Sequence, residues 1–538
     1  MSAIKNEILA KNEKFLPAQD SKPRMRPHRR QFVVGSKAFR AYEDWQSHQL
    51  DASTWVSYCA ELRADWVSDA DGIEWMLLGL AVETLESQAD PLIEIARTAS
   101  ADVPDLYASW AGRWVLIGRS EIHMDASGLL GCFYGTTSNK QMWVSSSSVL
   151  LTKILSPNAP PAVVPETLHY EAGISWFPPP YSHFVGISRL LPSQVIELKT
   201  GSIRSRSLMP PIDPSLGYDK TLELFKNSLI TALKRLPTEE NELWLGLTGG
   251  IDSRLLFAIA HYAGIKIIPF TRISARMSLG DRLLPPKLAQ ELGYKHIYLQ
   301  RQKSNFDRQP LVTEHTGGHV SVGDAEPFIQ SVRDHLKGIS VGGWCFETGK
   351  ALFRDLLPDT FDDPKICARQ IAQLFGEPVD SVMTQKIRDW LELIQKTPQE
   401  HLDWRDRFFI EQRLGGWQSS KEQLYDLTKV ERVPIINAAR NYALLLGLEE
   451  SCRINAQYQI DLLSQTAPTL SKYPYNPPNS YFGTLIGFKA IAIQLVSNPI
   501  YVYRKFAGKV RWITSRIKLS QDSLYFYRKI VGRLRSKK

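Results

Sequence analysis

The sequence predicts a mixed α/β protein built from two different parts, and three observations lead to that class. Between residues 31 and 207, short strand-like runs are separated by turn residues, which is typical of antiparallel sheets with a few helices. After a proline-rich stretch at 209–214, helix-length and strand-length segments alternate, which predicts a doubly wound parallel sheet with helices on both faces. Beyond residue 400 the pattern is mostly helical.

The elements follow in chain order. In the first part, strands are expected at 31–34, 75–79, 112–118, 131–134, 143–147 and 194–198. A helix follows the linker, because apolar residues recur on one helical face from Leu222 to Leu233. Strands at 242–248, 266–271, 296–300 and 339–342 then alternate with helices at 252–263, 282–292 and 326–337. Ligands of such a sheet bind at the carboxyl ends of its strands.

The composition is that of an ordinary globular chain, since 43% of the 538 residues are hydrophobic and 22% are charged. The five cysteines are scattered and never spaced as CxxC, which argues against a disulfide framework and a structural zinc site. No apolar run is long enough for a signal peptide or a membrane-spanning helix. We therefore expect a cytoplasmic protein.

The formal net charge of +9 is concentrated at the two ends. Residues 504–538 hold twelve lysines and arginines against one acid, Asp522, and residues 1–30 hold eight bases against three acids. The body between them is acidic, which argues against nucleic acid as a partner. We expect 1–30 to be a flexible basic arm and 481–538 a basic, aromatic helical tail. A solvated terminal helix and a peripheral membrane contact are both open for that tail.

One loop carries the clearest chemical signal. The buried-strand pattern at 242–248 runs directly into Gly249-Gly250 and then into an apolar helix that begins near Asp252. Glycines let backbone N–H groups approach a ligand closely, and a helix N-terminus adds partial positive charge, so the loop suits phosphate oxygens. The Asp252 carboxylate would repel that anion unless a divalent cation lay between them, so we expect Mg²⁺. A tight turn before a helix is the alternative interpretation.

The loop resembles the SGGxDS pyrophosphate loop of the asparagine synthetase family, with Thr248 where that family usually has serine. Three later segments agree in order. They are Asp281 before a helix that ends in Leu-Gly, Gly343 followed by Glu347, and the segment 431–437, which is similar to Glu-Ala-Arg-Val-Pro-Phe-Leu-Asp. The resemblance implies an ATP-pyrophosphatase domain of the adenine nucleotide α-hydrolase type at 208–480. It also implies a glutaminase-like, Ntn-type domain at 31–207.

The resemblance further implies that a carboxylate attacks the α-phosphate of ATP, pyrophosphate leaves, and ammonia or an amine then displaces AMP. Asp252 and Glu347 are the implied catalytic and metal-binding carboxylates, and Thr348 replaces a second acid of the family. Asp281 has a plain helix N-cap as its alternative role. The implied contacts to ATP and pyrophosphate are Leu247, Thr248, Gly249, Gly250, Ile251, Asp252, Ser253, Asp281 and Gly343.

Two positions depart from the family. Glutamine-hydrolysing members begin with a cysteine after removal of Met1, whereas Ser2 stands here. We therefore expect the domain at 31–207 to have lost its nucleophile, with a serine nucleophile at Ser2 as the competing interpretation. The family also has a lysine late in the synthetase region, and the counterpart at 453–463 offers Arg453 but no lysine.

The leading hypothesis is an asparagine synthase-like, ATP-dependent amide ligase that forms AMP and joins a small carboxylic acid or a peptide to ammonia or an amine. A nucleotide-binding pseudoenzyme that scaffolds a polysaccharide or peptide-modification pathway is the alternative. A tRNA-thiolating or lysidine-forming enzyme is a weaker third, because such chains lack the preceding sheet domain and this one has no cysteine by the loop.

Overall fold

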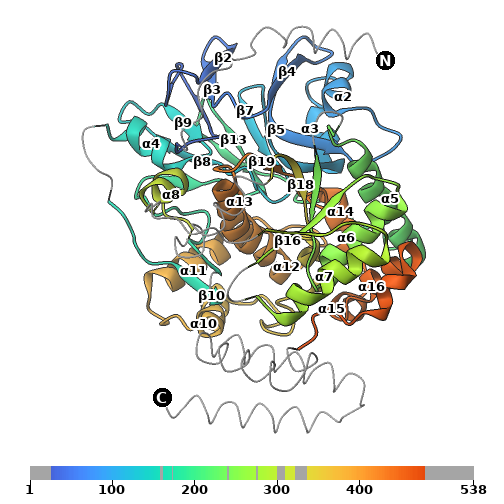
Figure 1. Cartoon of the computed structure of the whole chain (residues 1–538). Coiled ribbons are helices and arrows are strands. Elements are labelled where there is room, and N and C mark those ends of the chain that lie inside the picture. Colours follow the sequence, from blue (N-terminus) through green and yellow to red (C-terminus); the bar gives the residue numbers. More distant parts are fainter. Residues whose placement is uncertain are drawn as a thin grey trace. The chain divides into compact units, whose positions relative to one another are not determined.

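The computed structural model describes residues 26–157, 162–171, 174–238, 242–273, 277–299, 309–320 and 336–478 (Figure 1). The arm up to residue 25, most of the helix expected at 326–337 and the tail at 481–538 lie outside the described residues. Within the described residues, no helix combines the length and the apolarity that crossing a bilayer requires. All five cysteines are free, as the sequence predicts.

The N-terminal part contains two six-stranded antiparallel sheets and a small hairpin. The first sheet has the order β12 (Ser188–Arg189), β8 (Phe133–Thr136), β9 (Met142–Ser145), β1 (Phe32–Gly35), β3 (Thr54–Tyr58), β2 (Gln46–Asp51). The second has the order β14 (Ile203–Ser205), β13 (Gln194–Glu197), β7 (Glu121–Met124), β6 (Trp110–Gly118), β5 (Glu74–Glu83), β4 (Ala64–Ser68). The hairpin pairs β10 (Leu168–Glu171) with β11 (Ile174–Trp176).

These two sheets pack face to face, and helices cover their outer faces. Phe32 and Val34 of β1 share a buried core with Met76 of β5, whereas Val33, which points to the opposite face, packs with Leu150. Leu150 belongs to α4 (Ser148–Leu155), and the outer face of the second sheet packs against α2 (Pro91–Arg97) and α3 (Val103–Leu106). The result is a helix–sheet–sheet–helix arrangement.

The C-terminal part is built on one five-stranded sheet, and every pair of neighbouring strands in it is parallel. Its order is β17 (Ile297–Leu299), β16 (Ile268–Arg272), β15 (Leu243–Gly246), β18 (Gly338–Val341), β19 (Val430–Arg432). From β15 the chain first builds outward through β16 and β17, and it then returns to place β18 on the other side of β15. The strand order therefore reverses between β15 and β18, where such sheets bind ligands.

Helices cover both faces of this sheet, as expected (Figure 1). Trp244 of β15 packs with Val312 of α8 (Gln309–Thr316) and Leu424 of α13 (Ser419–Tyr425). On the other face α6 (Ile251–Tyr262) packs against α5 (Tyr218–Lys234) and α16 (Gln457–Thr466). The other helices are α7 (Leu279–Glu291), α10 (Pro364–Phe375), α11 (Val382–Lys396), α12 (Trp404–Phe408), the π-helix η3 (Phe409–Gln418), α14 (Ala439–Leu446) and α15 (Glu450–Ile454). Short 3₁₀ turns are η1 (Tyr107–Ser109), η2 (Phe346–Lys350) and η4 (Pro468–Lys472).

A buried polar network joins the two parts. Arg113 of β6 donates two hydrogen bonds of 2.7 Å to the carboxylate of Asp426, which follows α13. Asn437 donates to the carboxylate of Asp125 at 2.8 Å. Joined in this way, the described residues up to Pro477 form one compact unit, although the sequence pattern changes near residue 208.

The described end of the expected basic arm is not free. His28 is buried, and Arg30 donates a hydrogen bond of 2.7 Å to the backbone carbonyl of Val430 in β19. The expectation of a flexible arm is therefore wrong for residues 26–30, because these side chains find partners in the C-terminal part. Its charge pattern gave no sign of those partners, which lie 400 residues away for Arg30.

His315 of α8 is fully buried in this same region and is held as a neutral ring. Its Nδ1 accepts the backbone N–H of His28 at 2.9 Å, and its Nε2 lies 2.6 Å from the carbonyl oxygen of Gln423, which accepts a hydrogen. A proton on Nδ1 would face the N–H of His28 with no acceptor. Burial is the main cause that lowers the pKa of His315 to about 3.

We expect His315 to make the protein less stable as the pH falls below about 6.5. In that range the unfolded chain binds a proton on this ring and the folded chain does not. The free energy of unfolding therefore falls by about 1.4 kcal/mol per pH unit for this residue alone. Replacement His315→Gln keeps one acceptor and one donor, so its unfolding free energy should fall less steeply between about pH 6.5 and pH 5. Equal slopes for the two proteins, measured by denaturant unfolding, would contradict this role.

Candidate functional site

The predicted loop lies at the carboxyl edge of the parallel sheet, where the strand order reverses. It joins β15 to α6, and the segment after β18 packs directly on the first turn of α6. A Cβ atom at Gly343 would lie 2.6 Å from the backbone nitrogen of Ser253 and 2.7 Å from Cβ of Asp252. Only glycine permits this approach, so Gly343 is brought to the first turn of α6 as the sequence analysis expected.

The first residues of the loop are fixed by the neighbouring strand β16. The backbone N–H of Leu247 donates to the carbonyl oxygen of Phe270 at 2.8 Å, and the Leu247 carbonyl accepts the Thr271 hydroxyl at 2.6 Å. Thr248 is exposed, and its backbone N–H donates to the Ser253 hydroxyl oxygen at 3.0 Å. The loop is therefore preorganised by bonds at both of its ends.

Both glycine amides of the loop are bonded within the chain. The N–H of Gly249 donates to Oδ1 of Asp281 at 2.9 Å, and the N–H of Gly250 donates to Oγ1 of Thr248 at 3.1 Å. The expectation that these two amides stand open for phosphate oxygens is wrong for this structure, because Asp281 and Thr248 already supply acceptors.

The first turn of α6 has unpaired backbone donors, whereas both glycine amides have acceptors. No described residue accepts a hydrogen from the backbone N–H groups of Ile251, Asp252 or Ser253. These are the unpaired donors that every helix start presents, and the helix dipole places partial positive charge beside them. The electrostatics at this end of α6 therefore still suit an anion.

Asp252 is held in an ion pair with a lysine that the sequence analysis missed. The ammonium of Lys350 lies 2.5 Å from Oδ1 and 2.6 Å from Oδ2 of Asp252. Nε2 of Gln459 in α16 donates to Oδ1 of the same carboxylate at 2.6 Å. Both side chains of the ion pair are partly buried, so the pair is shielded from bulk water.

Glu347 belongs to the same 3₁₀ turn as Lys350. Side chains three residues apart in such a turn lie on the same side, so Glu347 and Lys350 share one side of η2. The Glu347 carboxylate makes no hydrogen bond or ion pair with any described residue. Thr348, which replaces the second acid of the family, is buried, and its hydroxyl also lacks a partner among the described residues.

The carboxylates of Asp252 and Glu347 suit a magnesium ion that is bound partly by the protein and partly by phosphate oxygens. The described residues contain no cluster of three acidic, histidine or cysteine side chains that would hold a metal ion by themselves. Mg²⁺ that arrives with ATP takes one or two protein carboxylates and completes its shell with phosphate oxygens and water. Glu347 is available for that role, whereas Asp252 must first release Lys350.

Asp281 connects the loop to α7. The N-cap of α7 is Ser278, whose Oγ accepts the N–H of Asp281 at 3.0 Å and donates to its Oδ2 at 2.8 Å. The N-cap role considered for Asp281 is therefore wrong, because it lies in the first turn of the helix. Its other oxygen holds Gly249, so Asp281 positions the loop.

A C-terminal segment also holds the loop, through an arginine that the sequence analysis did not select. Arg254 of α6 donates to the carbonyls of Tyr473 at 2.7 Å, Pro474 at 2.9 Å and Gly249 at 3.1 Å, and burial lowers its pKa to about 10. The backbone N–H of Asn476 donates a hydrogen bond of 3.1 Å to the Gly249 carbonyl. An arginine directly before the apolar run 255–260 was the signal available in the sequence.

Arg453 has a partner elsewhere and does not reach Asp252. It is buried and pairs with Asp406 at 2.7 Å. The segment 453–463 contributes Gln459 to the site instead, and the nearby ammonium is that of Lys350 from a different element.

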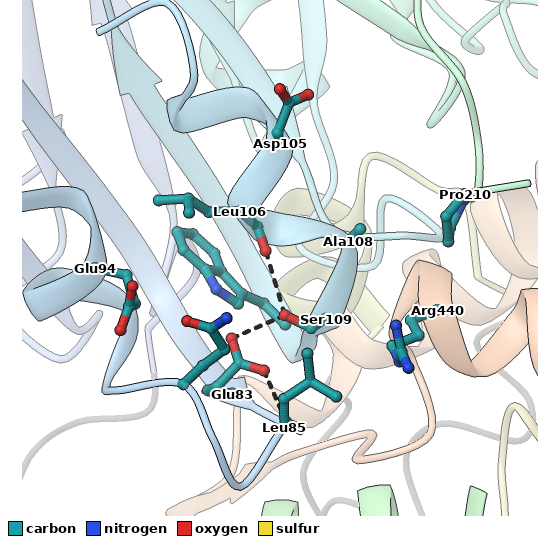
Figure 2. Close-up of a pocket in the computed structure, with 11 residues that line it drawn as sticks. Glu83, Leu85, Glu94, Asp105, Leu106, Ala108, Ser109, Pro210 and Arg440 are labelled. Atoms are coloured by element: carbon teal, nitrogen blue, oxygen red, sulfur yellow. Dashed lines mark hydrogen bonds between the residues drawn. The ribbon is translucent and has the colours of Figure 1, made fainter. Parts of the chain in front are cut away.

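A cavity of about 200 Å³ lies elsewhere, between the second sheet and α14 (Figure 2). It is lined by Glu83, Leu85, Gln88, Glu94, Asp105, Leu106, Ala108, Ser109, Trp110, Pro210 and Arg440. The Glu83 carboxylate accepts the Leu85 N–H and the Ser109 hydroxyl, both at 2.8 Å, and burial raises its pKa. Glu83 thus has a structural role, and no predicted site residue lines this cavity.

No protein-family model matches the chain. No curated protein matches it at a significant level.

Proposed function

We propose that this protein is an ATP-dependent, AMP-forming amide ligase of the asparagine synthetase type. The observation that carries the proposal is the set of unpaired backbone donors in the first turn of α6, which lies at the switch point of a parallel sheet beside the Asp252–Lys350 pair. Such an edge binds ligands, and three unpaired backbone donors with an ammonium nearby suit phosphate oxygens.

In this proposal the N–H groups at the start of α6 bind the phosphates of ATP, and Lys350 shifts from Asp252 toward the charge that develops on the leaving pyrophosphate. Preorganised donors of this kind stabilise a transition state by about 3 kcal/mol each. Glu347 and Asp252 would hold Mg²⁺, which would supply further neutralisation of the phosphate charge. Lys350 also provides the lysine that the resemblance requires and that the segment 453–463 lacks.

The N-terminal part is proposed to be a glutaminase-like domain without its nucleophile. Its two facing antiparallel sheets between helices support the resemblance, and the cysteine that the family uses is replaced by Ser2. The two buried cysteines Cys59 and Cys132 have raised pKa values because of burial, which makes thiolate chemistry there unfavourable. Ammonia or an amine is thus the proposed nitrogen donor, and a small carboxylic acid or a peptide is the acceptor.

One observation favours the second candidate, a nucleotide-binding pseudoenzyme. The hydrogen bond from Gly249 to Asp281 and the ion pair of Asp252 with Lys350 satisfy loop groups internally. A scaffold could keep these bonds with ATP bound and carry out no turnover.

Pyrophosphate exchange separates the two candidates. Purified protein, Mg²⁺ and labelled pyrophosphate are incubated with ATP and a panel of carboxylic acids, and label entering ATP is counted. A ligase shows exchange with at least one acid, and Asp252→Asn lowers that exchange at least about a hundredfold. Exchange that depends on no acid, or that is unchanged in the variant, would reject the ligase, and ATP binding without exchange would support the scaffold.

A further inference from the structure

The cavity shown in Figure 2 is lined by both parts of the chain, and none of its residues belongs to the candidate nucleotide site. On the N-terminal side it is bounded by α2, α3, η1 and the segment after β5. Trp110 also lines it and belongs to the apolar core on the outer face of the second sheet. On the C-terminal side it is bounded by Pro210 and Arg440. A molecule bound here would therefore contact both parts.

Arg440 gives the cavity a cation that has no partner. It is partly buried in the first turn of α14, and its guanidinium makes no hydrogen bond or ion pair with any described residue. By contrast, Arg354, which is also partly buried, pairs with Asp406 at 2.9 Å. The start of α14 adds partial positive charge, and no N-cap side chain accepts a hydrogen there. This side of the cavity suits a carboxylate, which a guanidinium can bind through two parallel hydrogen bonds.

Two acidic side chains line the cavity away from Arg440. Asp105 of α3 is exposed, and its carboxylate makes no hydrogen bond or ion pair with any described residue. Glu94 of α2 accepts the N–H of Ala89 with one oxygen at 2.7 Å, and no described residue donates to its other oxygen. Figure 2 shows Glu94 and Arg440 on opposite sides of the cavity. The cavity thus offers opposite charges to the two ends of a bound molecule.

Trp110 adds a buried donor that has no acceptor. Its side chain is 1% exposed, and its Nε1 has no hydrogen-bond partner among the described residues. A buried N–H without an acceptor is unfavourable, so an oxygen atom of a bound molecule would stabilise this site. The apolar part of the lining consists of Leu85, Leu106, Ala108 and Pro210. These side chains suit a short hydrocarbon chain that separates two charged groups.

We propose that this cavity binds a small zwitterion, a molecule with a carboxylate at one end and an ammonium group at the other. Arg440 holds the carboxylate, Asp105 and Glu94 hold the ammonium, and an oxygen of the ligand accepts the Nε1 hydrogen of Trp110. Because Arg440 belongs to the C-terminal part and both acids belong to the N-terminal part, the ligand links the two parts and stabilises the folded chain. The site shares no residue with the nucleotide site and does not depend on the proposed ligase function.

Calorimetry with the full chain tests the site. Glycine, β-alanine and γ-aminobutyrate differ in the spacing of their two charges, and the tightest of them is compared with the acid and the amine of the same chain length. We expect this zwitterion to bind at least about tenfold more tightly than either of these singly charged molecules. Arg440→Met should weaken its binding at least about tenfold, and Asp105→Asn should weaken it less, because Glu94 still meets the ammonium. Arg369→Met, which removes an exposed arginine of α10, should leave binding unchanged.

Hydrogen–deuterium exchange of the unchanged protein keeps the test valid if Arg440→Met fails to fold. The tightest zwitterion should slow exchange in the peptides covering 103–110, from α3 to the start of β6, and 439–446, which is α14. Absence of both binding and this protection would overturn the site. Equal affinity in Arg440→Met, or equally tight binding of the singly charged molecules, would overturn the assignment of a zwitterion.

Discussion

Replacement of Lys350 by methionine is expected to reduce pyrophosphate exchange at least about a hundredfold, because one preorganised charged donor stabilises the transition state by about 3 kcal/mol. In the unchanged protein the Lys350 ammonium lies 2.5 Å from the Asp252 carboxylate. Without this ammonium, the negative carboxylate faces the incoming phosphates with no cation to balance its charge. Both effects act on the reaction and not on the hydrophobic core. The rate of label transfer into ATP at saturating acid measures the loss.

Lys472→Met is the matched control for this variant. The Lys472 side chain is 68% exposed and its ammonium pairs only loosely with Glu291 at 3.5 Å, so exchange should stay unchanged. If Lys350→Met retains full exchange while its unfolding temperature drops as much as that of Asp252→Asn, the ion pair is structural and Lys350 has no part in the chemistry.

Replacement of Arg113 by methionine is expected to lower the free energy of unfolding by about 3–5 kcal/mol, the usual cost of breaking a buried ion pair. The variant leaves Asp426 buried with neither of its two 2.7 Å hydrogen bonds, and the carbonyl of Leu129 loses the bond from Nε of Arg113. Because this pair links the two sheet-bearing parts, we also expect them to unfold in separate steps. Denaturant unfolding followed by tryptophan fluorescence and circular dichroism reports both effects.

Arg204→Met provides the comparison for Arg113. Arg204 also pairs with an acid, Glu121, at 2.9 Å, but its side chain is 51% exposed, so its removal should change the free energy by less than about 1 kcal/mol. An Arg113→Met protein as stable as Arg204→Met, with one coincident transition, would show that the buried pair does not hold the parts together.

Most of the sheet framework follows from local sequence patterns. The run 243–246 is apolar except for its glycine because its two faces are covered by different helices, and this is the pattern of a central parallel strand. Turn residues on either side allowed six antiparallel strands to be predicted, namely β1, β5, β6, β8, β9 and β13. The other strands of the N-terminal part, which are β2, β3, β4, β7, β10, β11, β12 and β14, were not predicted. The unpredicted strand β19 has only three residues, two of them charged, and it exists because β18 supplies a parallel partner.

In the helix η3, local helix propensity gives the wrong expectation, because a sequence with two adjacent glycines still forms a helix. Gly415 and Gly416 lie inside it, where glycine normally destabilises a helix by about 1 kcal/mol per residue. A Cβ atom at Gly416 would approach Trp176 to 2.7 Å, so close packing between the two parts of the chain requires glycine there. Trp176 is far from Gly416 in the sequence, so a pattern of neighbouring residues cannot reveal this contact.

In the candidate site too, local features were predictable from the sequence, whereas contacts between distant residues were not. The loop and α6 were predicted because a strand, glycines and a helix start fall side by side in the sequence, whereas Gly343 was placed with them only by the family resemblance. The sequence did not predict that Asp281 occupies the Gly249 amide or that Lys350 and Gln459 hold Asp252, because these partners are 32, 98 and 207 residues away. Only the folded chain brings those charges into contact.

Hydrogen–deuterium exchange with and without Mg²⁺ and ATP tests most directly whether the start of α6 holds a triphosphate. We predict that the peptide covering 247–254 gains the strongest protection on nucleotide addition, because the free N–H groups of Ile251, Asp252 and Ser253 acquire acceptors. Saturating nucleotide that leaves this peptide unprotected, or that protects a distant segment instead, would contradict a triphosphate site at this helix.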